Sequence, residues 1–232
     1  SDVCSSDLLY MWILFAFGSA LFAGLTSILA KCGIKNTDSN AATAIRTIIV
    51  LIFSWIMVFL VGAQHSIGNV SVKTWTFLIL SGLATGASWL CYFRALQIGD
   101  VDKVVPVDKS SAILSILLAF IFLHESISPL KLLCVVLIGV GTYLMITKKG
   151  TSSENSGKKG WRWFFYALGS AVFASLTSIL GKVGIENIDS NLGTAIRTIV
   201  VLIMAWIVVF VTKKQDSVRT IDHRELGFIC LS

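Results

Sequence analysis

The sequence has few charged residues and few prolines, and neither scarcity suits a water-soluble domain. Charged side chains make up 14% of the 232 residues, and there are 2 prolines. Because a soluble domain carries roughly 25% charged residues, we expect this chain to reside in a membrane. Hydrophobic residues reach 55%, and the mean hydropathy of +0.82 points the same way.

Patterns of enzymes and metal proteins are also missing. The five cysteines form no CxxC pair and have no histidines clustered beside them, which leaves a metal site or a disulfide framework unsupported. No P-loop is present, so ATP is not the direct driver, and no nucleophile has a recognisable base. We therefore expect no enzyme activity, no cofactor and no metal. The basic residues behind the net charge of +6 lie between apolar runs, so no nucleic acid is expected as a partner.

Apolar runs of membrane-spanning length dominate the sequence. Crossing about 30 Å of hydrocarbon takes roughly 20 apolar helical residues. On that rule the expected transmembrane helices are residues 10–30, 42–62, 74–94, 104–123, 129–147, 161–181 and 193–212. An eighth begins near Glu225 and runs to Ser232. The predicted fold class is an all-α integral membrane bundle.

The chain contains two copies of one unit. When the sequence is shifted by 151 residues, residues 16–59 lie on residues 167–210 without a gap. Of these 44 positions 13 differ, which leaves 31 identical. Such self-similarity indicates a repeat architecture. We predict two homologous five-helix modules, the second of them incomplete.

The two modules are expected to have opposite orientations in the membrane. Because the first module contributes an odd number of spans, the second must enter from the other side, which gives inverted-topology repeats. Alternating the loops between the two sides places three basic residues on one side and 13 on the other. The positive-inside rule then puts the linker between the modules in the cytoplasm and the N-terminus outside.

Four segments are expected along the chain. Residues 1–10 are polar and change abruptly into the apolar run that starts at Met11, so we expect them to be foreign to the protein. Residues 11–147 form the first module, and residues 148–160 form a flexible linker rich in Ser, Gly and Lys. Residues 161–232 form the second module, which is truncated in its third helix.

Four stretches of the sequence carry a family resemblance. They are MWILFAFGSALFAGLTSILAKCGI, AIRTIIVL, SGLATGASWLCYFRALQIGDV and VVPVDKSSAILSILLAFIFLHE. Together they are similar to the EamA-like family of five-helix modules in the drug/metabolite transporter superfamily, over residues 11–148 and 161–232. The resemblance implies ten helices, a cytoplasmic N-terminus, and export or exchange of small metabolites by alternating access. It also implies that Glu125 is a family hallmark. The implied N-terminus opposes the charge distribution, so orientation is left open.

A polar stripe lies in the predicted fourth span. Asp108, Ser111 and Ser115 recur at helical spacing, and Lys109 is next to Asp108. Charges within a span are costly, so they usually face a cavity or a partner. In one interpretation these residues bind a polar substrate or a coupling proton. In the other, Pro106 opens the helix, Asp108 caps it at the membrane interface, and Lys109 extends to the headgroups.

An arginine recurs in the second helix of each copy, as Arg46 and Arg197. A buried guanidinium could hold an anionic group through paired hydrogen bonds. We prefer a structural interpretation, in which the two arginines reach the headgroups or pair with Asp38 and Asp189, because Asp38 and Arg46 lie near the same membrane face. Trp89 is deep in its span and is a weaker candidate for lining a cavity.

Small residues four positions apart indicate close helix–helix packing. The predicted packing positions are Ala16, Ala20 and Gly24 in the first span, and Gly82 and Gly86 in the third. We interpret these rows as packing surfaces, not as parts of a binding site.

A secondary transporter with a cavity between the two modules is the leading hypothesis. A non-transporting membrane scaffold or regulatory subunit and a passive channel are the alternatives. The expected partners are the lipid bilayer and a small-molecule substrate, and a homodimer is left open. The expected location is the cell membrane, as a multi-pass protein of a bacterial inner membrane.

Overall fold

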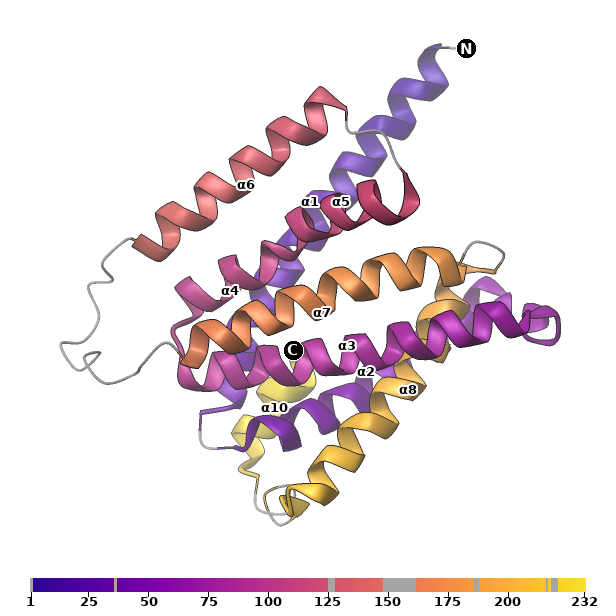
Figure 1. Cartoon of the computed structure of the whole chain (residues 1–232). Helices are drawn as coiled ribbons and strands as arrows, with labels where there is room; N and C mark the ends of the chain where they lie inside the picture. Colours follow the sequence, from indigo (N-terminus) through magenta and orange to yellow (C-terminus); the bar gives the residue numbers. More distant parts are fainter. Residues whose placement is uncertain are drawn as a thin grey trace.

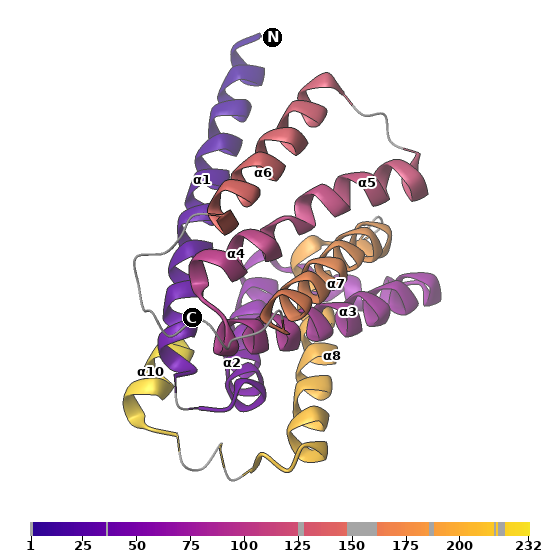
Figure 2. The ribbon, with the colours of Figure 1, turned by 60° about the vertical axis from the view of Figure 1, so that its left-hand side comes forward.

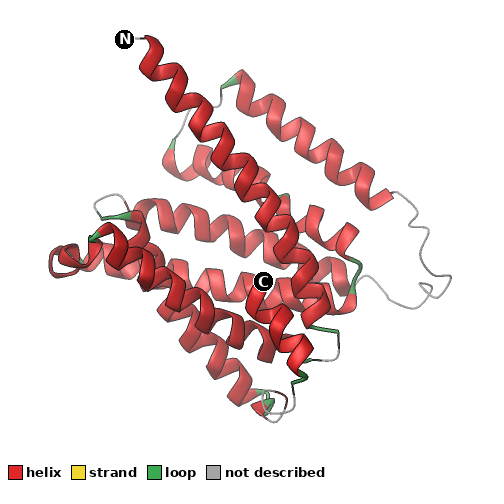
Figure 3. Cartoon of the chain, turned by 180° about the vertical axis from the view of Figure 1, so that it is seen from behind, coloured by secondary structure: helices red, strands yellow, loops and turns green. Residues whose placement is uncertain are grey.

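The protein is a bundle of α-helices (Figure 1). The computed structural model describes residues 2–35, 37–124, 128–147, 162–185, 188–215, 217 and 221–232. Its helices are α1 (Asp2–Gly33), α2 (Ser39–Val61), the short 3-10 helix η1 (Ala63–Asn69), α3 (Val72–Ile98), α4 (Val101–Lys109), α5 (Ser111–Leu123), α6 (Pro129–Thr147), α7 (Arg162–Ile185), α8 (Ser190–Val211) and α10 (His223–Leu231). No strand occurs in these ranges (Figure 3).

Six helical segments are long and apolar enough to cross a membrane. They are Met11–Gly33, Ser39–Val61, Val72–Ile98, Val101–Leu123, Arg162–Ile185 and Ser190–Val211. A shorter apolar helix covers Pro129–Met145. The prediction of an all-α integral membrane protein is therefore confirmed. The helix α1 starts at Asp2 and so includes most of residues 1–10, which were expected to be foreign to the protein. The predicted linker of residues 148–160 lies outside the described residues.

The fourth span differs from the prediction. It starts at Val101, so Pro106 lies inside α4 and does not open it. The span is divided at Ser110, between α4 and α5. There the amide of Ser110 donates to the carbonyls of Pro106 (3.0 Å) and Val107 (3.2 Å), which tightens the turn.

The same capping chemistry opens the second helix of each module. The side chain of Asp38 accepts a hydrogen bond from the amide of Asn40 (3.0 Å) and starts α2. Asp189 accepts one from the amide of Asn191 (2.8 Å) and starts α8. Both aspartates satisfy amides that have no partner within the helix. The sequence repeat is thus a repeat of local structure.

The helices α2 and α8 run antiparallel. Ala44, near the start of α2, packs in one cluster with Val209, near the end of α8. Val58, near the end of α2, packs in another with Ala195, near the start of α8. Ala195 is the repeat equivalent of Ala44, and Val209 is the repeat equivalent of Val58, each 151 residues later. The two copies are therefore related by an internal two-fold axis, as the predicted inverted topology requires.

A second set of contacts obeys the same two-fold relation. An added Cβ on Gly33 of α1 would lie 2.7 Å from a side-chain carbon of Ile229 on α10. An added Cβ on Gly184 of α7 would lie 3.2 Å from a side-chain carbon of Leu78 on α3. Gly184 is the repeat equivalent of Gly33, and Ile229 is the repeat equivalent of Leu78, again 151 residues later. The helix α3 accordingly lies along α7 and contacts α8, just as α10 contacts α1 and α2 (Figures 1 and 2).

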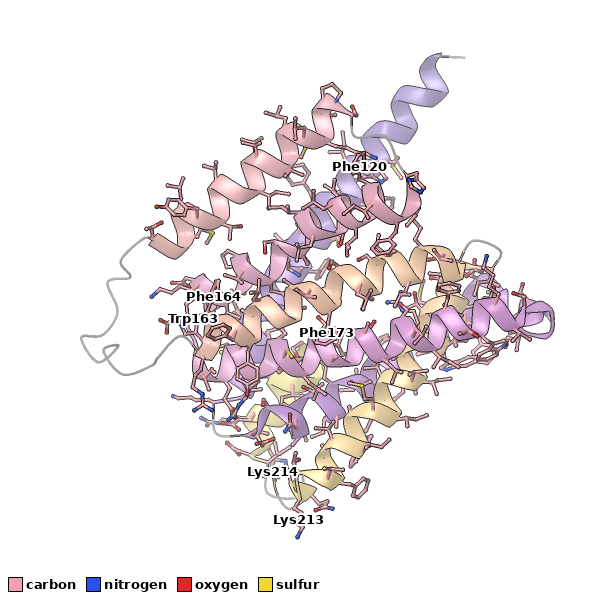
Figure 4. All side chains as sticks on the ribbon, viewed as in Figure 1. Phe120, Trp163, Phe164, Phe173, Lys213 and Lys214 are labelled. Atoms are coloured by element: carbon pink, nitrogen blue, oxygen red, sulfur yellow. The ribbon has the colours of Figure 1, made fainter. Side chains whose placement is uncertain are left out.

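One core cluster holds α3, α4 and α7 together. Its buried members include Phe93 and Leu96 of α3, and Ala167 of α7. Trp163 and Phe164, at the start of α7, pack against it (Figure 4). Because this cluster joins helices from both modules, it fixes the position of α7 against the broken fourth span.

Candidate functional site

A polar cavity of about 320 Å³ lies at the contact between the modules. Its lining residues are Ala23, Thr26 and Ser27 of α1, Arg46 of α2, Ser88, Trp89 and Tyr92 of α3, Asp108 and Lys109 of α4, Ser111 of α5, and Ala174 of α7. A larger cavity, of about 390 Å³, borders α2, α8 and α10. We place the candidate site in the smaller cavity, because three charged side chains, those of Arg46, Asp108 and Lys109, line it.

Asp108 is held in place by a residue of the other module. Its side chain is buried, with 9% of the residue exposed. The hydroxyl of Ser170 on α7 donates to Oδ1 of Asp108 at 2.6 Å, and Nζ of Lys109 lies 3.7 Å from Oδ2. Ser88 of α3 donates to the carbonyl of Ser170 at 3.1 Å. A buried carboxylate needs such partners, and this one joins three helices.

The position of Asp108 contradicts the interpretation as a cap at the membrane interface. Asp108 lies in the last turn of α4, seven residues after its first residue, Val101. The side chain of Lys109 is 59% exposed, yet this residue also borders the cavity. Both charges therefore belong to the cavity wall.

The guanidinium of Arg46 lies over two aromatic rings. Its guanidinium carbon is 5.0 Å from the ring centre of Trp89 and 5.4 Å from that of Phe93. These are cation–π distances. One terminal nitrogen donates to the carbonyl of Ser232 at 3.1 Å, while the buried Nε has no hydrogen-bond partner among the described residues. The residue also lines the cavity, and Nε of Arg197, the equivalent arginine outside the cavity, is buried without a described partner as well.

The expected pairing of Arg46 with Asp38 is wrong. The carboxylate of Asp38 caps α2, and its Oδ2 lies 3.8 Å from Nζ of Lys214. Lys214 lies just after the last residue of α8, and Figure 4 labels it together with Lys213. The ion pair thus joins the start of α2 to the end of α8, and Arg46 has no ion-pair partner among the described residues.

Tyr92 belongs to the site, although the sequence analysis did not select it. Its hydroxyl donates to Ser27 at 2.8 Å, and Ser27 donates to the carbonyl of Ala23 at 2.9 Å. A sequence signal was available, because Tyr92 lies four residues after Ser88 and so on the same helix face. Ser170 was also missed, and its role depends on the packing of α7.

The other predicted residues lie elsewhere. Ser115 is partly buried but does not line the cavity. Arg197 is also outside it and lies beside Gly181 of α7. Glu125 lies outside the described residues. Among the described residues, no three His, Cys, Asp or Glu side chains lie close enough to hold a metal ion, so we assign none.

The predicted packing positions divide into two groups. Ala16, Ala20 and Gly24 on α1 are exposed, so the expected helix contact is not formed there. Gly82 and Gly86 lie where α3 crosses α8. An added Cβ would lie 2.7 Å from Cβ of Val200 at Gly82, and 2.6 Å from Cε of Met204 at Gly86.

Long apolar helices related by an internal two-fold axis, with a polar cavity lined by the first module and by Ala174 of α7, are typical of a multi-pass membrane protein of the transporter type. Comparison with known proteins supports this class. The model of the EamA-like transporter family matches residues 10–147, and the chain belongs to that family. A Sinorhizobium protein described as an uncharacterized transporter in the cobO 3′ region is 41% identical over 134 residues, which are 58% of this chain and 95% of that protein.

Proposed function

We propose that the chain is a secondary transporter that exports or exchanges small polar metabolites or drugs by alternating access. The observation that carries this proposal is the cavity where α7 meets the first module, with three charged residues, Arg46, Asp108 and Lys109, in its wall. Charged residues inside a span are costly and usually serve substrates, ions or protons. Family membership favours transport over enzymatic activity, and we propose a bacterial inner membrane as the location.

The cavity wall supports a division of roles. Arg46 would bind an anionic group of the substrate, because its guanidinium lines the cavity and has no ion-pair partner among the described residues. Asp108 would bind a coupling proton or a polar substrate group. A volume of about 320 Å³ lies at the low end of the usual range for ligand pockets, which favours small substrates. Rocking of one module against the other would then expose the cavity to each side in turn.

Flux measurements test the proposal directly. The full chain is reconstituted into lipid vesicles and given pools of small polar metabolites, with and without a proton gradient. We expect accumulation of at least one compound above its equilibrium level when a gradient of protons or of an exchanged substrate is present. Flux that never exceeds equilibrium would indicate a passive channel. Absence of flux for every pool, with the protein shown to be inserted, would favour the scaffold.

Replacing Arg46 by lysine is expected to weaken binding of a substrate that carries an anionic group. Lysine keeps the charge but loses the forked donor geometry of the guanidinium. Losing one hydrogen bond to a charged group costs about 1.5–3 kcal/mol, so KM should rise roughly 10-fold or more. The measurement is the concentration dependence of uptake. The matched control is Arg197→Lys, the same change at the equivalent position outside the cavity, and an equal KM increase in both variants would contradict the role of Arg46.

A further inference from the structure

The polar side chains around the cavity form two short chains of hydrogen bonds, and chemistry fixes the direction of each. In the first chain, Ser27 donates to the carbonyl of Ala23 at 2.9 Å. A carbonyl oxygen can only accept, so this bond uses the single proton of the Ser27 hydroxyl. The hydroxyl of Tyr92, 2.8 Å from that of Ser27, must therefore be the donor in their bond. Tyr92 then has no proton left for the cavity.

The second chain ends on a carboxylate, and its direction is fixed in the same way. Ionised Asp108 can only accept, so Ser170 gives it the proton of its hydroxyl, at 2.6 Å. The hydroxyl of Ser88 lies 3.1 Å from the carbonyl oxygen of Ser170 and 3.2 Å from its hydroxyl oxygen, and it is the donor in either bond. Ser88 therefore has no donor left for the cavity either.

One part of the cavity wall can thus only accept hydrogen bonds. Every hydroxyl proton in this part is already directed into the protein. The four side chains that share this property and line the cavity are Ser27, Ser88, Tyr92 and Asp108. The oxygen atoms of these side chains still have lone pairs, so we call this part the acceptor wall.

The opposite chemistry comes from Arg46 and Lys109, which also line the cavity. Guanidinium and ammonium groups can only donate. A ligand that satisfies both parts of the wall needs an acceptor group and a donor group. A site that holds buried acceptors rejects a ligand without the donor, because those acceptors are then left unpaired. The cavity therefore selects by hydrogen-bond direction as well as by charge.

We propose that Tyr92 is a specificity-determining residue, which accepts a hydrogen bond from a hydroxyl or ammonium group of the substrate. The substrate class is then a small acid that carries such a donor in addition to its anionic group. Within the acceptor wall Tyr92 is the most accessible residue, because it is only partly buried whereas the other three are buried. The inference rests on the proposed function and deepens it.

Binding of three matched acids to the full chain tests this assignment. Propionate has no hydrogen-bond donor, lactate adds a hydroxyl group, and alanine adds an ammonium group. Isothermal titration calorimetry in detergent gives the Kd of each acid. We expect lactate and alanine to bind more tightly than propionate. In Tyr92→Phe this preference should fall roughly fivefold, as the loss of one hydrogen bond predicts, while the Kd of propionate should stay within about twofold of the wild-type value.

Two further variants separate this role from a structural one. Tyr143→Phe makes the same change at an exposed position of α6, outside the cavity, and should leave all three Kd values unchanged. Ser27→Ala removes the oxygen that accepts the proton of Tyr92. The tyrosine can then turn its proton towards the cavity, so the preference for lactate and alanine should fall, while propionate binds at least as tightly as before.

Several results would overturn the proposal. Equal weakening of all three acids in Tyr92→Phe would indicate a structural role, and unchanged binding would indicate none. A preference for alanine alone would assign the selection to the charge of Asp108. Absence of binding by all three acids would contradict the substrate class. Failure of the proposed function has a different signature, in which lactate and alanine bind with the expected preference but neither is taken up into vesicles under a gradient of protons or of exchanged substrate.

Discussion

Replacing Asp108 by asparagine is expected to abolish gradient-driven transport while the bundle stays folded. The asparagine side chain has nearly the same shape, and its carbonyl oxygen can still accept the hydrogen bond from Ser170 (2.6 Å in the wild-type chain). What disappears is the negative charge beside Lys109 and the ability to carry a proton. If Asp108 couples transport to protons, uptake should fall to the level of empty vesicles. The measurement is uptake by vesicles under a proton gradient.

A matched variant separates chemistry from folding in this experiment. Asp102 lies in the first turn of the same helix and is exposed, so Asp102→Asn changes the net charge equally without touching the cavity. Both variants should elute as monodisperse protein in detergent and unfold at wild-type temperature to within a few degrees. Wild-type transport by Asp108→Asn would reject the proposed role of this residue.

The spans and the repeat could be predicted from the sequence because both depend on simple quantities. A span needs enough apolar residues to cross the hydrocarbon, and every predicted span within the described residues is helical, the fourth as the two helices α4 and α5. The inverted arrangement follows from an odd number of spans, and the antiparallel contacts of Ala44 with Val209 and of Val58 with Ala195 agree with it. No side-chain detail is needed for these inferences.

The role of Arg46 could not be predicted because sequence position gives depth in the membrane but not a partner. Arg46 and Asp38 lie near the same membrane face, so the sequence suggested a pairing between them. The carboxylate is instead engaged by the first turn of α2 and by Lys214, from the other module. The guanidinium of Arg46 lies over Trp89 and Phe93 instead.

Contacts between modules were missed for a related reason. The hydrogen bond from Ser170 to Asp108 joins residues 62 positions apart, and it depends on the register at which α7 packs against the broken span. The exposed row on α1 shows the converse, since Ala16 and Ala20 have the same spacing as their buried counterparts on α7. A small-residue pattern indicates where a helix can pack, but it does not show whether a helix packs there.

Replacing Gly82 by alanine is expected to destabilise the contact between α3 and α8 strongly. The new Cβ would lie 2.7 Å from Cβ of Val200 and 2.9 Å from the carbonyl oxygen of Arg197. Neither neighbour is the end of a flexible side chain, so the helices must separate. Overpacking of this kind costs about 1–3 kcal/mol. Thermal unfolding in detergent should show the loss as a lower Tm.

Two other glycines supply the controls for this prediction. At Gly86 the added Cβ would meet Cε of Met204 at 2.6 Å, but this methyl group can rotate away, so Gly86→Ala should cost less. At Gly141 of α6 nothing described lies within 4 Å, so Gly141→Ala should be neutral, or stabilising through its better helix propensity. The expected order of Tm is Gly141→Ala highest, then Gly86→Ala, then Gly82→Ala. If all three variants melt together, close packing of α3 on α8 does not hold the two modules together, and the joint would have to depend on the polar contacts around Asp108 and Ser170.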